Sequence, residues 1–156
     1  MPFRMDLVAG DRHAILTALA LDAPDAFDDA ARFAHLSLGG AIDPTWLDRF
    51  SEAVRRVTEA DAPEDFLDAR RELDGPDDDE GGRTIEAVDA EWISAIARLD
   101  DRRLDAVTGA WIELIEEDLG DLPREEKPWI RNLAGEIVAF CRRAQSSPDV
   151  LLAWSL

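Results

Sequence analysis

The chain has 156 residues, of which 35 are acidic and 17 are basic, so its formal net charge at pH 7 is −18. Nonspecific nucleic-acid binding and attraction to anionic membranes both depend on cationic side chains, so this charge argues against nucleic acid and membrane as partners. A hydrophobic fraction of 46%, with five Trp and six Phe, is ample for the core of a single domain spanning residues 1–156.

The expected location follows from the segments that the sequence lacks. Residues 1–6 contain no long apolar stretch of the kind that opens a secretory signal, and no run reaches the ~20 apolar residues of a membrane span. Cys141 is the only cysteine, so an intramolecular disulfide is impossible. We therefore expect a cytoplasmic protein.

The first 40 residues predict two strands separated by a helix. Residues 3–8 alternate between apolar and polar side chains, which is typical of a strand. Asp11 can then cap a helix that runs through Leu21, and a helical turn fits residues 25–30. Residues 33–38 alternate again and predict a second strand. Its two faces would carry Ala34, Leu36 and Leu38 on one side and Phe33, His35 and Ser37 on the other.

The middle of the chain predicts two helices and an acidic loop. Asp43 and Pro44 form a helix start, with Asp43 as the N-cap and Pro44 at the first helical position. Pro63 opens a shorter predicted helix, whose spaced side chains are Phe66, Leu67, Arg70 and Leu73. Residues 74–82 combine five acidic side chains with three glycines and a proline, so we expect a flexible loop.

The second half predicts three helices between two strands. A short strand fits residues 84–88, and Asp89 can cap a helix that ends near Leu99. Asp100 and Asp101 start a longer helix, which Gly120 and Pro123 end, and Pro128 starts the last helix. The nearly continuous apolar run over 150–156 predicts a strand buried on both faces. The expected fold is therefore α/β or α+β and helix-dominated, with about five helices packed on a small sheet that includes the first and last strands.

The apolar spacing of the last third resembles a known family. Residues 92–99, the segment 139–144 and the strand 150–154 look like the YfbM-like family of uncharacterised bacterial proteins. The resemblance implies a small α/β protein that finishes with a helix and an apolar strand. It implies no activity, because the family has no catalytic motif that could be carried over.

Few residues in this sequence could carry chemistry. His35, in the middle of a strand, is the best single candidate for a catalytic residue, although a purely structural role is the more usual one for such a histidine. His13 is expected at the surface. Cys141 lies on a predicted buried helix stripe, where a cysteine usually behaves as an inert small hydrophobe. Two histidines and one cysteine, far apart, are too few for a zinc site. Residues 77–88 match an EF-hand loop only in part and lack two essential oxygens, so we expect neither metal nor cofactor.

Three classes of function remain open. The leading hypothesis is a non-enzymatic interaction protein, of inhibitor or immunity type, that meets a basic partner. The alternatives are a small-molecule-binding or regulatory domain and a hydrolase that uses carboxylates with His35. Acidity of this degree is also typical of salt-adapted proteomes. The candidate partner-binding residues form two acidic stretches, namely Asp77, Asp78, Asp79 and Glu80, and Glu113, Glu116, Glu117 and Asp118.

Overall fold

Five antiparallel strands form one sheet in the order β2-β1-β5-β4-β3. A computed structural model describes residues 4–21, 24–29, 31–39, 44–58, 66, 70–72 and 83–155 of the chain. The strands are β1 (Arg4–Gly10), β2 (Ala34–Gly39), β3 (Arg70–Glu72), β4 (Arg83–Val88) and β5 (Asp149–Ser155). Because the sheet is antiparallel and helices cover its faces, the fold belongs to the α+β class.

Helices account for most of the remaining described residues. They are α1 (Arg12–Ala20), α2 (Pro44–Thr58), α3 (Ala90–Ala97), α4 (Asp101–Leu119) and α5 (Glu126–Ala144), together with a 3₁₀ helix, η1 (Pro24–Asp28). The predicted number of helices and the inclusion of the first and last strands in the sheet are therefore confirmed.

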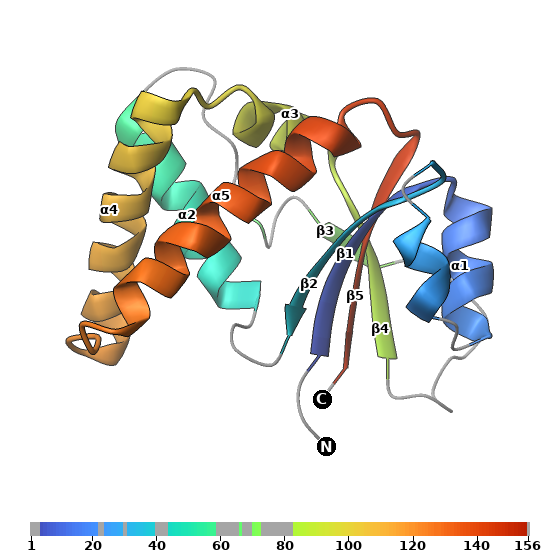
Figure 1. Ribbon diagram of the computed structural model, residues 1–156, viewed down its shortest axis with the longest axis horizontal. Coiled ribbons are helices and arrows are strands. Elements are labelled where there is room, and N and C mark those ends of the chain that lie inside the picture. Colours follow the sequence, from blue (N-terminus) through green and yellow to red (C-terminus); the bar gives the residue numbers. More distant parts are fainter. Residues whose placement is uncertain are drawn as a thin grey trace.

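The sheet lies between two helical layers of unequal size (Figure 1). Helices α2 to α5 cover one face, and the larger core cluster joins them to Leu7 of β1, Leu36 of β2 and Leu152 of β5. The opposite face is covered by α1 and η1, where Val8 and Leu151 pack against apolar residues such as Ile15. This division follows from strand geometry, since consecutive side chains of a strand point to opposite faces.

Strand β5 lies at the centre of the sheet. It pairs with β1 on one side and with β4 on the other, and Leu151 and Leu152 are both fully buried. The prediction of a strand buried on both faces is confirmed for residues 150–153. Trp154 remains partly exposed, and its indole N–H donates to Glu86 Oε1 at 3.0 Å.

The polar residues beside the helix ends explain most helix boundaries. Asp11 and Asp100 cap α1 and α4, and their carboxylates accept backbone N–H bonds from Ala14 at 3.0 Å and from Arg103 at 2.8 Å. Gly120 ends α4 with a positive φ of 85°. Helix α5 begins at Glu126, two residues before the predicted start at Pro128. The proline is tolerated there because the first backbone N–H groups of a helix have no acceptor within it.

One predicted helix is wrong in part. Residues 70–72, expected on the helix opened by Pro63, form β3 instead and pair with β4, with Arg71 opposite Ala87. The spacing of the apolar side chains favours a helix locally, but pairing with a neighbouring strand outweighs this weak preference. Asp43, Pro63 and the predicted loop over 74–82 lie outside the described residues.

Candidate interaction surface

The catalytic candidate His35 contacts a carboxylate on the neighbouring strand. Its Nε2 lies 2.9 Å from Asp6 Oδ1, and its ring packs against Phe27 with the ring centroids 5.4 Å apart. An Asp–His pair of this kind orients an imidazole, but hydrolysis also needs a nucleophile or an activated water beside it. Cys141 cannot serve as that nucleophile, because it belongs to the core on the opposite face of the sheet.

The other two chemical candidates lie where the sequence predicts them. Cys141 is fully buried, and burial raises the pKa of its thiol well above the usual range, so that little thiolate forms near neutral pH. His13 is exposed on the first turn of α1. Among the described residues, no group of three or more His, Cys, Asp or Glu side chains could hold a metal ion.

A cleft of about 600 Å³ lies at one end of the sheet, where α3 begins and α5 ends. Two ion pairs line it, Arg12 with Asp149 at 3.4 Å and Arg71 with Asp89 at 3.8 Å. Asp89 precedes α3 as predicted, but its side chain makes no capping hydrogen bond, so the predicted cap is wrong in this respect. The Arg71 guanidinium provides a competing partner for that carboxylate. His35 is not among the residues that line the cleft.

The four acidic candidates on α4 divide into two groups. Asp118 forms two hydrogen bonds with Arg49 of α2, at 2.7 and 3.0 Å, and these raise the pKa of the guanidinium. Glu116 pairs with Lys127 at 3.8 Å. In contrast, Glu113 and Glu117 are exposed, and neither has an ion pair within the described part of the chain. The other four candidates, residues 77–80, lie outside the described residues.

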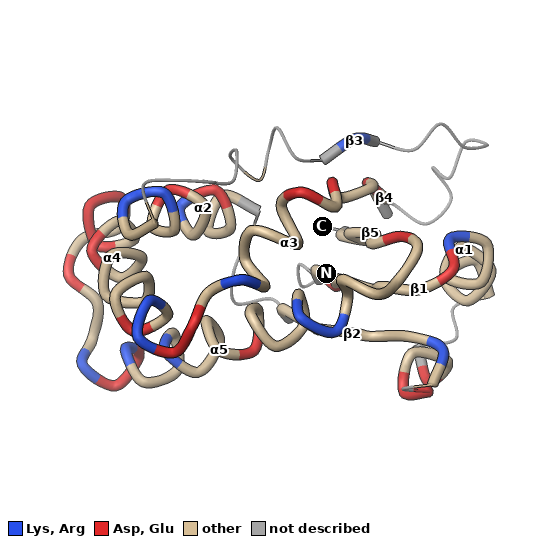
Figure 2. Tube along the Cα trace, turned by 90° about the horizontal axis from the view of Figure 1, so that it is seen from above, with Lys and Arg blue, Asp and Glu red and all other residues tan. Residues whose placement is uncertain are grey.

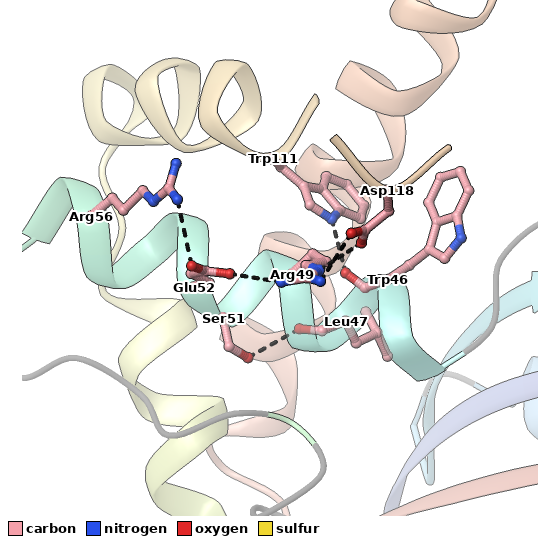
Figure 3. Close-up of polar contacts among 8 residues, drawn as sticks. All are labelled: Trp46, Leu47, Arg49, Ser51, Glu52, Arg56, Trp111 and Asp118. Carbon is pink, nitrogen blue, oxygen red and sulfur yellow. Dashed lines mark hydrogen bonds and ion pairs between the residues drawn. The ribbon is translucent and has the colours of Figure 1, made fainter. Parts of the chain in front are cut away.

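The contact between α2 and α4 is fixed at several points (Figure 3). Arg49 also bonds Glu52 on its own helix at 3.2 Å, and the buried indole N–H of Trp111 donates to the carbonyl of Trp46 at 2.8 Å. The ring of Trp46 also lies edge-on to that of Trp111, with the two ring centroids 6.4 Å apart. These bonds hold the acidic part of α4 and the first turns of α2 in one fixed arrangement.

Two large apolar side chains are exposed beside this acidic segment. Leu119, the last residue of α4, is 64% exposed, and Trp129, in the first turn of α5, is 42% exposed. The sequence predicts partial exposure of Trp129, because it directly follows Pro128. The sequence gives no signal that the ring of Trp129 lies edge-on to that of Trp46, with the two ring centroids 6.4 Å apart.

Charged positions are spread along the outer helices in Figure 2. Red acidic positions and blue basic positions both occur along α4 and α5. On α2, Arg56 pairs with Glu52, one helical turn away, at 3.5 Å. Arg56 therefore pairs locally with a carboxylate on its own helix. Arg142 differs, since it donates to the backbone carbonyls of Ala97 and Leu99 at the end of α3.

Comparison with known proteins found no match among family models, curated proteins or solved structures. In the described part of the chain, no helix is both long enough and apolar enough to cross a membrane.

Proposed function

We propose that this chain is a non-enzymatic interaction protein, of inhibitor or immunity type, that binds a basic partner protein in the cytoplasm. The observation that carries the proposal is the exposed acidic segment from residue 113 to residue 127, which contains seven acidic side chains and two basic ones. Within it, Glu113 and Glu117 are exposed and have no intramolecular ion pair among the described residues.

Clustering of charge is what makes this segment relevant to binding. At physiological salt the Debye length is only about 8 Å, so charges spread over the whole molecule act weakly on a partner, whereas a cluster acts together. A cluster opposite in sign to the partner accelerates association by about 10- to 1000-fold at low ionic strength. The fixed contact between α2 and α4 supports this role, because a rigid cluster needs no reordering when the partner arrives.

The test begins with affinity capture from a lysate of the source cells at low ionic strength, repeated at high ionic strength. A basic protein retained only at low salt is expected. The association rate of that protein is then measured with the double variant E113Q/E117Q, and we expect it to fall about twofold or more at low salt.

A charge-matched control separates a local cluster from net charge. Asp25 and Asp28 are exposed on η1, in the opposite helical layer, so D25N/D28N removes the same charge at a distant place. Equal association rates for the two double variants would rule out the acidic segment as the binding surface. Capture of an acidic partner, or capture that is indifferent to salt, would rule out the electrostatic function altogether.

The cleft at the end of the sheet favours a second candidate function, the binding of a small polar molecule. Its volume of about 600 Å³ lies within the range of ligand sites, and the Arg12–Asp149 and Arg71–Asp89 pairs could reorganise around a ligand that carries both charges. Screening zwitterionic metabolites such as amino acids by thermal shift tests this function. A ligand that stabilises the wild type but not R12Q would support it, and the absence of any stabilising ligand would count against it.

A further inference from the structure

Apolar side chains lie in and beside the acidic segment. Four of them lie at the corner where α4 ends, α5 begins and α2 starts, and we call this group the corner patch: Trp46, Leu119, Leu122 and Trp129. Trp46 and Leu122 are half-buried and pack on the main core, whereas Leu119 and Trp129 are among the most exposed large apolar side chains of the described chain.

The corner patch is held in place by its surroundings. The ring of Trp129 packs edge-on against Trp46, which packs in turn against the fully buried Trp111. The backbone N–H of Leu122 donates to Glu116 Oε2 at 3.1 Å, so the connection between α4 and α5 is tied to α4 itself. A partly exposed Trp in a fixed position resembles the hot spots of protein interfaces, where rigid aromatic side chains lose little entropy on binding.

The rim of the corner patch carries a strong excess of negative charge. Around Leu119, Leu122 and Trp129 the chain places acidic side chains that are mostly exposed, namely Glu113, Glu116, Glu117, Asp118, Asp121, Glu125 and Glu126. The basic side chains in the same stretch are Arg124 and Lys127, and Lys127 pairs with Glu116.

We propose that the corner patch is the docking site for a basic segment of a partner protein, which inserts an apolar side chain between Leu119 and Trp129 and places its arginines or lysines against the acidic rim. An arginine can also stack on the exposed face of Trp129. A second copy of this chain is the less favourable occupant, because it would bring an equally acidic rim against this one. The inference rests on the proposed function and adds the place and the chemistry of contact.

Two synthetic peptides test the proposal on the full chain. The first alternates arginine with leucine, and the second has serine in place of every leucine, so that the two peptides differ in apolarity but not in charge. Their binding is followed at low salt by the indole N–H signals of the ¹⁵N-labelled protein, with the Trp129 signal assigned from W129F. We expect the leucine peptide to shift the Trp129 signal and to leave that of buried Trp92 unchanged.

Substitutions then measure how much the patch contributes. W129A and L119A should each weaken the binding of the leucine peptide by about tenfold, as expected for an interface hot spot. L21A is the matched control, because Leu21 is 72% exposed but lies at the end of α1 in the opposite layer. Since Leu119 and Trp129 are exposed, both variants should keep the wild-type melting temperature. If W129A lowers the melting temperature, the loss of peptide binding is judged from L119A alone.

The possible results separate this inference from the proposed function. If both peptides bind equally and salt weakens the binding of both, the proposed electrostatic function stands and the proposal of an apolar docking site is wrong. If neither peptide binds at low salt, both proposals fail. If sedimentation shows a dimer that W129A abolishes, the corner patch is a contact between copies of this chain, and the proposal of a basic partner there is overturned.

Discussion

The thiol of Cys141 is placed so that it cannot react without unfolding. It is fully buried in the core of the large helical layer, and its pKa is raised by that burial. We therefore expect a thiol reagent to label the native protein far more slowly than the protein in denaturant, because both access and thiolate formation are blocked. The measurement is the absorbance of the released reagent group over time. Rapid labelling of the native state would place the thiol at the surface and reopen a catalytic role.

Arg142 illustrates a role that spacing alone does not reveal. Its guanidinium donates to the carbonyls of Ala97 and Leu99, which lie at the carboxyl end of α3 and lack helical partners. The positive charge also interacts favourably with the negative end of that helix.

The variant R142M should lower the free energy of unfolding by about 1 kcal/mol, a modest value because the side chain is exposed. Urea denaturation measures it. The neighbouring R143M is the control. Arg143 is also exposed, its side chain makes no hydrogen bond to α3 among the described residues, and its removal changes the net charge by the same amount. An equal loss in both variants would show that charge, rather than capping, is responsible.

The contacts of a single residue could be predicted from the sequence only where its partner is close by in the sequence. Asp11 and Asp100 each accept a hydrogen bond from a backbone N–H only three residues further along the chain, and the sequence predicts both caps correctly. Asp89 stands before a helix in the same way, yet its carboxylate lies against Arg71 of a different strand. The contact between Trp46 and Trp129 likewise joins distant segments, so the corner patch could not be predicted, although the acidic residues around it could.

At the level of the helices, replacing a glycine with alanine should have opposite effects on stability at two positions. Gly135 lies within α5, and an added Cβ would meet no atom within 4 Å, so G135A should stabilise the protein by about 0.5–1 kcal/mol through better helix propensity. Gly120 has equally open space but a φ of +85°, so G120A should destabilise by about 1 kcal/mol.

Thermal denaturation of the two glycine variants tests this pair directly. Because neither added methyl group meets other atoms, any difference between the variants reflects backbone conformation rather than packing. If G120A were neutral or stabilising, the end of α4 would have to adopt another conformation, and the connection that carries Leu122 would not be fixed as described.

Most elements follow from patterns that the sequence shows directly, and β3 marks the limit of that approach. Helices α4 and α5 each have a continuous apolar stripe. On α4, Val107, Trp111, Leu114 and Ile115 are buried, whereas Leu104 on the same stripe is half-buried. Strand β3 has only three residues and no alternation of its own, so it exists because β4 offers a free edge. The resemblance to the YfbM-like family, which also rests on apolar spacing, stays a prediction.

The charge of the whole molecule should affect its stability. A net charge of −18 on 156 residues favours the expanded state through self-repulsion, which dissolved salt screens. We expect the melting temperature to rise as sodium chloride increases to about 0.5 M, where the Debye length falls to a few ångströms. Exposed ion pairs such as Arg12–Asp149 oppose this trend, but each contributes at most about 1 kcal/mol.

The salt response has an internal comparison. The variant E113Q/E117Q removes two charges that have no ion pair among the described residues. Its melting temperature should therefore be higher than that of the wild type at low salt and should change less as salt is added. A melting temperature that falls with salt would mean that attractive pairs outweigh the repulsion. The acidic residues would then stabilise the fold, and their availability to a partner would be in doubt.

The central position of β5 also has a consequence for how the chain is made. Without residues 149–155 the described strands form two separate pairs, β2 with β1 and β4 with β3, and no hydrogen-bonded ladder between described strands joins the two pairs. During synthesis both pairs emerge from the ribosome before β5 does, and contacts between residues so far apart in sequence form slowly. The edges of β1 and β4 that face β5 in the folded sheet therefore lack this partner until β5 is inserted between them. Protection by a chaperone would be most useful during this interval.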